Sequence, residues 1–154
     1  MPLEIDSTAP AFSLPTNGDS TLSLASMKGK IVVLYFYPKD MTPGCTTESQ
    51  DFRDRSEDFE KAGAVIVGAS KDSVARHDKF VAKHNLPFAL LSDEDGTLCA
   101  DYGVWKLKKL YGREFMGIER STFIIDAKGV IRHIWRKVKV KGHVNEVLNT
   151  VLAL

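Results

Sequence analysis

Long apolar runs are missing from this sequence, and so is any strong excess of charge of one sign. No stretch stays apolar for the length needed to cross a bilayer, and residues 1–6 lack the basic and apolar regions of a secretory signal. The net charge is +1 with neutral histidines, so no global field attracts nucleic acid, an anionic membrane or acidic substrates. We therefore expect a soluble, cytoplasmic protein with neither a membrane nor a nucleic-acid partner.

Cysteine is scarce, because the chain contains only Cys45 and Cys99. A chain of 154 residues can bury its own core without a disulfide, and a reducing compartment would not preserve one. No second cysteine follows Cys45 at the spacing of a Cys-x-x-Cys disulfide oxidoreductase. A cysteine phosphatase would need an arginine where this chain has Asp51. These absences argue against both classes, and each cysteine must be judged by its own surroundings.

Repeats, low-complexity tracts and linkers are also absent, which favours one domain over residues 1–154. Apolar spacing and turn residues predict a hairpin, then alternating strands and helices, a short helix, a second hairpin and a terminal helix. We therefore expect an α/β fold with a mixed central sheet, helices on both faces and an N-terminal β-hairpin. The expected strands are 12–14, 21–24, 31–36, 64–69, 87–91, 122–125 and 130–135; the expected helices are one from Pro43 to a stop at Gly63, then 73–85, 97–102 and one that begins near His143; 103–117 is expected to be a long loop.

Cys45 lies where a predicted strand gives way to a predicted helix. Residues 31–36 are apolar and mostly β-branched or aromatic, as in a strand that is buried on both faces. Thr42 suits the N-cap, where its hydroxyl could engage the Cys45 N–H, and Pro43 suits the first helical position. The free N–H groups and the positive end of the helix dipole favour a thiolate. The sequence thus predicts a reactive thiol at Cys45.

The stretch Tyr37-Pro38-x-x-x-Thr42-Pro43-Gly44-Cys45-Thr46 resembles the peroxidatic-cysteine motif of peroxiredoxins, which are thioredoxin-fold thiol peroxidases. Segments 36–40, 90–96, 102–105 and 119–126 resemble one subgroup, the bacterioferritin-comigratory or Q-type peroxiredoxins. The matching segments follow in the right order along nearly the whole chain. The resemblance implies a thioredoxin-like fold and the reduction of hydrogen peroxide and organic hydroperoxides.

The same resemblance implies roles for four residues. Cys45 would attack one oxygen of the peroxide and become a sulfenic acid. Thr42 would hydrogen-bond the peroxide, Pro38 would shield the thiolate, and Arg120 would complete the site with a permanent charge and several planar donors. The electron donor would be thioredoxin, glutaredoxin or a low-molecular-weight thiol.

The histidines do not suggest a further centre. His77 and His84 lie on one stripe of a predicted helix, which favours a buried or half-buried place for both. The spacing of the four histidines does not indicate a metal site. We therefore expect neither a metal nor a cofactor.

The chain departs from the subgroup at the residue that would resolve the sulfenic acid. Many members carry a second cysteine five residues after the first, where this chain has Gln50, and others carry it in the next helix, where residues 73–84 contain none. Cys99 remains, although a small buried thiol is ordinary in its surroundings. The main hypothesis is a one-cysteine mechanism with an external thiol; the alternatives are resolution by Cys99 and a peroxide sensor without turnover. No extension follows the last predicted helix, which favours a monomer or a weak dimer.

Overall fold

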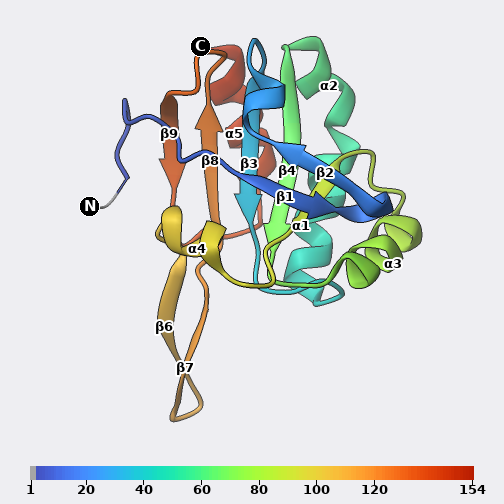
Figure 1. Cartoon of the computed structure of the whole chain (residues 1–154), viewed down its shortest axis with the longest axis vertical. Helices are drawn as coiled ribbons and strands as arrows, with labels where there is room; N and C mark the ends of the chain where they lie inside the picture. Colours follow the sequence, from blue (N-terminus) through green and yellow to red (C-terminus); the bar gives the residue numbers. More distant parts are fainter. Residues whose placement is uncertain (1–2) are drawn as a thin grey trace.

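A computed structural model describes residues 3–154, which fold around a seven-stranded sheet with the order β2-β1-β5-β4-β3-β8-β9 (Figure 1). Its strands are β1 Ser13–Thr16, β2 Ser20–Ser23, β3 Ile31–Phe36, β4 Ala64–Ser70, β5 Ala89–Ser92, β8 Ser121–Ile125 and β9 Ile131–Trp135. Strands β3, β4 and β5 are parallel, whereas β8 pairs antiparallel with β3, and β9 with β8. At the other edge, β1 pairs antiparallel with β2 and with β5. The predicted mixed sheet and N-terminal hairpin are confirmed.

Helices cover both faces of this sheet, as predicted. They are α1 Pro43–Asp54, α2 Ser56–Lys61, α3 Val74–His84, α4 Thr97–Asp101 and α5 His143–Leu152, with short 3₁₀ turns at Asn17–Asp19 and Ala25–Met27. Residues of α1, α2, α3 and α5 pack into the core on one face, and residues of α4 pack into the core on the other. In Figure 1, α4 lies in front of the sheet and α5 behind it. No helix in the described part of the chain is long and apolar enough to cross a membrane.

The central strand β3 contributes to both cores. Its side chains alternate between the two faces, so Val32 and Leu34 join the core beside α4, whereas Val33 and Tyr35 join the core beneath α1 and α5. This double burial explains why the strand is an unbroken apolar run in the sequence. The sheet therefore separates two hydrophobic cores. After β3 the chain leads into α1, which places Cys45 in the core beneath α1 and α5.

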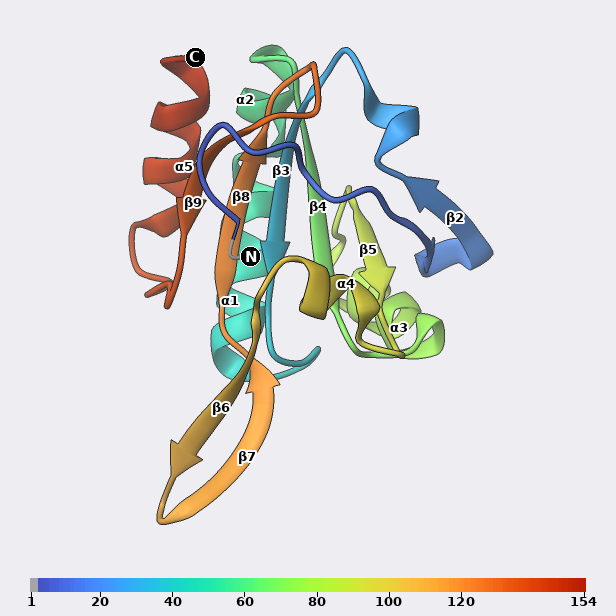
Figure 2. The ribbon, with the colours of Figure 1, turned by 60° about the vertical axis from the view of Figure 1, so that its left-hand side comes forward.

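The predicted loop at residues 103–117 is wrong. Most of this segment forms a second sheet of two strands, β6 Trp105–Leu110 and β7 Arg113–Ile118, which projects from the body of the protein (Figures 1 and 2). Tyr111 and Gly112 form the turn, and both have positive φ (50° and 76°), as a type I′ turn requires. A tyrosine rarely adopts this conformation, so the turn carried little sequence signal.

The helix that follows Cys45 is not continuous to Gly63, which is a second correction. Arg55 leaves the helical region with φ −109° and ψ 8°, and so separates α1 from α2. In a straight helix, Phe52 and Phe59 would lie about 10 Å apart along the axis. The break instead allows their rings to pack at 5.8 Å between centroids, with both buried. Gly63 follows α2 with φ 79°, in the left-handed conformation that suits a helix end.

Candidate active site

The predicted thiol lies at the junction of β3 and α1. Cys45 is the third residue of α1, and the residue is only 1% exposed. Thr42 is the extended N-cap residue and Pro43 the first helical residue, as predicted. The Cys45 N–H belongs to the first helical turn, whose N–H groups have no acceptor within the helix. The sulfur therefore lies at the positive end of the α1 dipole, where negative charge is stabilised.

The Thr42 side chain does not form the predicted cap. Its hydroxyl donates to the carbonyl oxygen of Lys39 at 2.8 Å and does not accept from the Cys45 N–H. The reason is the turn at Met41, whose φ of 70° folds the chain back so that the Lys39 carbonyl meets the hydroxyl. The Thr42 oxygen consequently keeps its lone pairs for another donor.

Arg120 contacts the sulfur, as expected from the resemblance. Its Nη2 lies 3.3 Å from Cys45 Sγ. Arg120 directly precedes β8, and the antiparallel register pairs Ser121 with Phe36 at the end of β3. That register brings a residue far along the chain to the same edge of the sheet as Cys45. A permanent cation at this distance stabilises negative charge on the sulfur.

Glu48 is a site residue that the sequence reasoning missed. It is fully buried, and its Oε1 accepts from Arg120 Nη1 at 2.7 Å. Burial raises the pKa of Glu48 to about 7, although the Arg120 charge opposes this rise. Its Oε2 has no hydrogen-bond partner among residues 3–154. The sequence feature that could have identified Glu48 is its position one helical turn after Cys45, which places both side chains on the same face of α1. Glu48 therefore fixes the guanidinium whose other nitrogen binds the sulfur.

Two neighbours shape the space around this guanidinium. A Cβ at Gly44 would lie 3.2 Å from Arg120 Nη2, so the glycine leaves room for the side chain. Lys108 reaches back from β6 and passes Gly117 of the facing strand. Burial lowers the pKa of Lys108, and the charge of Arg120 lowers it further. The base of the projecting hairpin thus adds a second cation near the site.

The structure brings three of the predicted residues together. Cys45 and Arg120 are in contact, and Thr42 lies one turn before Cys45 at the start of the same helix. Pro38 belongs to the connection between β3 and α1, where it is exposed. This arrangement combines a thiol, a fixed cation and a hydroxyl whose oxygen accepts no hydrogen bond from residues 3–154. Such a set can ionise a thiol and stabilise charge on a leaving oxygen.

Cys99 lies apart from this group. It is fully buried in α4 and belongs to the core on the opposite face of the sheet from Cys45. The Asp93 carboxylate accepts from the Cys99 N–H at 2.8 Å. Burial, together with a hydrogen bond to Asp93, raises the pKa of the Cys99 thiol. The structure therefore does not bring the two cysteines together.

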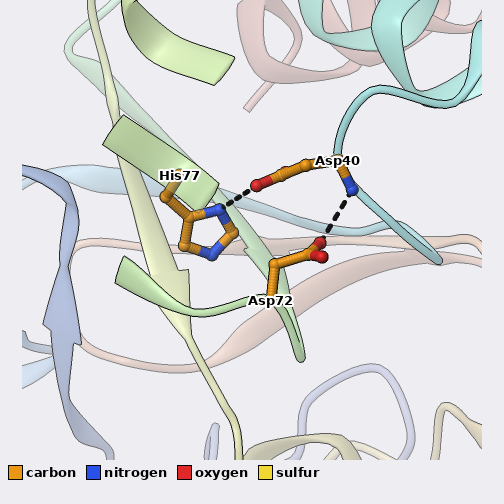
Figure 3. A group of neighbouring side chains, drawn as sticks. All are labelled: Asp40, Asp72 and His77. Carbon is orange, nitrogen blue, oxygen red and sulfur yellow. Dashed lines mark hydrogen bonds and ion pairs between the residues drawn. The ribbon is translucent and has the colours of Figure 1, made fainter. Parts of the chain in front are cut away.

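One group among the described residues has the composition of a metal site. Asp40, Asp72 and His77 are buried, and each offers a ligand atom within 4.8 Å of the others (Figure 3). However, these atoms already bind protein groups: His77 Nδ1 lies 2.6 Å from Asp40 Oδ2, and Asp72 Oδ2 accepts from the Asp40 N–H at 2.7 Å. A cation would have to displace these bonds. The donor set fits a hydrogen-bond network better than a metal site.

A thioredoxin-like sheet and a cysteine held by arginine at a helix N-terminus together define a thiol redox protein. The profile of the AhpC/TSA family matches residues 5–134, and the chain belongs to this family. Its relatives include peroxiredoxin Bcp of Bacillus subtilis (strain 168), 56% identical over 151 residues, or 98% of this chain and 96% of the relative. Another is a putative peroxiredoxin bcp of Coxiella burnetii, 55% identical over 148 residues, or 96% and 98%.

Solved structures agree with these relatives. A serine variant of Xylella fastidiosa PrxQ matches with a TM-score of 0.93 and 41% identity over 98% of this chain and 96% of that one. The bacterioferritin comigratory protein of Xanthomonas campestris matches with a TM-score of 0.88 and 46% identity over 92% and 90%. The thioredoxin-like peroxiredoxin fold and the resemblance to the bacterioferritin-comigratory or Q-type subgroup are thereby confirmed. The relatives support thiol peroxidase activity.

Proposed function

We propose that this protein is a peroxidase whose nucleophile is Cys45 and whose substrates are hydrogen peroxide and organic hydroperoxides. The observation that carries the proposal is the 3.3 Å contact between Arg120 Nη2 and Cys45 Sγ at the N-terminus of α1. Cation and helix dipole both stabilise the thiolate, which is the attacking species. The Xanthomonas campestris neighbour was studied for alkyl peroxide reduction, which supports including organic hydroperoxides here.

In the proposed reaction the Cys45 thiolate attacks the terminal oxygen of the hydroperoxide. An S–O bond forms and the O–O bond breaks, so the sulfur becomes a sulfenic acid and the other oxygen leaves as an alkoxide or hydroxide that takes a proton. The Thr42 oxygen accepts from the O–H of the peroxide, because its own hydrogen is donated to Lys39. Arg120 and the Cys45 N–H donate to the oxygen that leaves, where negative charge develops. Pro38 would cover the open side of the thiolate.

The sulfenic acid is resolved by an external thiol in this proposal. Cys99 lies across the sheet from Cys45, and both thiols are buried. Gln50 lies where many relatives carry a second cysteine, and its Nε2 is 3.2 Å from Nδ1 of His84 at the end of α3. An external thiol would attack the sulfenic sulfur, release water and form a mixed disulfide; a second thiol would then regenerate Cys45. Thioredoxin, glutaredoxin with glutathione, or another small thiol could serve.

Two measurements test this proposal. Peroxide consumption is followed with each candidate reductant, and we expect repeated turnover with at least one of them; consumption that stops after one equivalent would instead indicate a peroxide sensor. Separately, the protein is oxidised with one equivalent of peroxide, and the products are mapped by mass spectrometry. We expect a sulfenic acid at Cys45. A dominant Cys45–Cys99 disulfide would contradict the one-cysteine mechanism, and a Cys45→Ser variant that still turns over would contradict the assigned nucleophile.

A further inference from the structure

The segment between β3 and α1 carries two residues of the proposed site, Pro38 and Thr42, and two of its side chains, Tyr37 and Asp40, are buried in the interior. Asp40 is 1% exposed, whereas its neighbours Lys39 and Met41 are exposed. Met41 also holds a left-handed φ of 70°, which is unfavourable for a residue with a Cβ. A strained, exposed segment keeps its shape only where surrounding contacts fix it. Here those contacts converge on Asp40.

Asp40 is held by hydrogen bonds to three residues, one within its own segment and two in other parts of the chain. Its Oδ1 accepts from the Tyr37 hydroxyl at 2.5 Å, and its Oδ2 lies 2.6 Å from His77 Nδ1. Its backbone N–H donates to Asp72 Oδ2 at 2.7 Å. Figure 3 shows the His77 ring and the Asp72 carboxylate directed at the two ends of Asp40. The segment is therefore tied to α3 and to the turn that follows β4.

The bonds of His77 fix the direction of its ring. Its Nε2 lies 3.0 Å from the Leu91 carbonyl oxygen, which can only accept, so this nitrogen carries a hydrogen. A proton is then shared between Nδ1 and Asp40 Oδ2, on either partner, because two lone pairs would otherwise face each other. In both forms the buried pair is neutral as a whole. The imidazole thus bridges β5 and the segment that leads into α1.

Asp72 completes the network from the other side. Its Oδ2 also accepts from the Ser70 hydroxyl at 2.7 Å, and its Oδ1 accepts from Arg76 Nε at 3.1 Å. The one carboxylate that hydrogen-bonds the pair among residues 3–154 is that of Asp72, and it is paired with Arg76. Each carboxylate oxygen in the cluster has a donor or shares a proton. Such a network rigidifies the residues that it joins.

We infer that His77 is a positioning residue for peroxide reduction, which acts through Asp40. By holding Asp40, it keeps the 38–42 segment in the shape that directs the Thr42 hydroxyl to the Lys39 carbonyl and starts α1 at Pro43. This inference rests on the proposed function, because Thr42 and Cys45 are its targets. The hydrogen bonds of His77 within residues 3–154 go to Asp40 and Leu91 and not to Cys45, so its effect is on geometry.

Two substitutions separate the bonds of His77. His77→Gln retains a donor for the Leu91 carbonyl but leaves Asp40 Oδ2 without its partner. His77→Asn places an amide nitrogen near the position of Nδ1, where it can still donate to Asp40. Asp78→Asn is the matched control, because it alters the next, exposed residue of α3 and keeps an acceptor for the Gly18 N–H.

Two readouts are used with the full chain. The first is the rate constant of sulfenic acid formation by hydrogen peroxide, with reductant absent. The second is hydrogen exchange of the backbone amides of residues 40–46. We expect His77→Gln to slow oxidation on the order of tenfold or more and to speed exchange in this segment, with β8 and β9 unaffected. His77→Asn should recover most of the rate, and Asp78→Asn should match the wild type.

A wild-type oxidation rate in His77→Gln would overturn the inference, and so would an equal loss in His77→Asn. Loss of wild-type oxidation in EDTA with recovery on adding Zn²⁺ would assign a metal site instead, and would also overturn it. If His77→Gln does not fold, Tyr37→Phe removes a different bond to Asp40 and must speed the same exchange. Absence of sulfenic acid in the wild type would contradict the proposed function, whereas wild-type hydrogen exchange in His77→Gln would contradict the positioning role of His77; the two failures are thus distinguishable.

Discussion

Cys45 and Cys99 lie on opposite faces of the central sheet, each buried in its own core. A disulfide needs Cα atoms within about 7 Å of each other, and a sheet stands between these two residues. Joining them would require either α1 or α4 to leave its core. The sheet thus places the two cysteines of the chain in separate surroundings.

The first prediction concerns Cys99. Cys99→Ala should leave peroxide turnover unchanged with every reductant that supports the wild type, because in the proposed mechanism the external thiol reacts with Cys45 alone. The substitution should lower the free energy of unfolding by about 1 kcal/mol, as expected for a small loss of buried volume. Steady-state peroxide consumption and urea denaturation measure the two effects. A turnover rate that falls while single-turnover oxidation is preserved would show that Cys99 takes part in resolution.

The second prediction concerns Arg120. Arg120→Ala removes the donor at the sulfur and should lower the rate constant of peroxide reduction on the order of a hundredfold. Circular dichroism at pH 6.5 should show a folded protein, since Glu48, whose pKa is about 7, can take a proton and tolerate the loss of its partner. Arg132→Ala is the control, because that arginine also serves a carboxylate, Asp126, but at an exposed position. An unchanged rate constant in Arg120→Ala would show that Arg120 does not contribute to peroxide reduction.

The third prediction uses the pKa of Glu48, which burial raises from 4.5 to about 7. The folded state binds this proton more tightly than the unfolded state, so the contribution of Glu48 to stability is lost as pH rises from 4.5 through 7. By linkage the loss is about 3 kcal/mol. Glu48→Gln should abolish it, which urea denaturation at a series of pH values measures. A variant with the same pH dependence as the wild type would contradict this assignment.

The fourth prediction concerns His143, at the start of α5, whose Nε2 lies 2.8 Å from the Thr122 hydroxyl oxygen. Burial lowers the pKa of His143 from 6.5 to about 4. The unfolded state therefore binds this proton more tightly, and stability falls as pH drops from 6.5 toward 4. His143→Gln keeps a hydrogen-bond partner for Thr122 and should remove this loss. The Glu48 contribution to stability changes in the opposite direction over nearly the same pH interval, so the two contributions largely cancel in the wild type. In Glu48→Gln or His143→Gln only one of them remains, and the free energy of unfolding should therefore depend more steeply on pH than in the wild type.

The fifth prediction concerns Gly44. In Gly44→Ala the new methyl group would lie 3.2 Å from Arg120 Nη2, and the guanidinium must move a few tenths of an ångström away. Arg120 is held by Glu48, so the shift weakens its contact with Cys45. We expect peroxide reduction to slow severalfold, while the fold is retained because alanine suits a helix better than glycine. Stopped-flow oxidation measures the rate; equal rates in both proteins would show that the guanidinium adapts without consequence.

Local signals in the sequence were sufficient for much of the fold. β3 coincides with the predicted strand at residues 31–36, because its apolar run is set by burial on both faces. α1 begins at Pro43, since a proline at the first helical position is a strong start signal. α5 begins at His143, as its apolar spacing indicated. Each of these features is encoded within a few neighbouring residues.

Contacts between distant residues account for what could not be predicted. Glu48 became recognisable as a site residue only once the pairing of β8 with β3 had brought Arg120 to it. The bond between Asp40 and His77 joins residues 37 positions apart, and nothing in either local sequence indicates it. The Thr42 hydroxyl does not accept from the Cys45 N–H as predicted, because the left-handed backbone at Met41 brings the Lys39 carbonyl to it, and it donates there instead. Propensities describe segments, whereas these features arise from the packing of segments.

The hairpin of β6 and β7 has a consequence for how this protein can vary. Its strands pair only with each other among the strands of residues 3–154, and Leu107, Tyr111 and Phe115 on it are exposed. Substitutions toward its tip therefore disturb neither the seven-stranded sheet nor its two cores. Lys108, in contrast, reaches back toward the site, where burial and the charge of Arg120 lower its pKa. We therefore expect substitutions at the tip of the hairpin to be tolerated, and substitutions beside Lys108 and Arg120 at its base to be poorly tolerated.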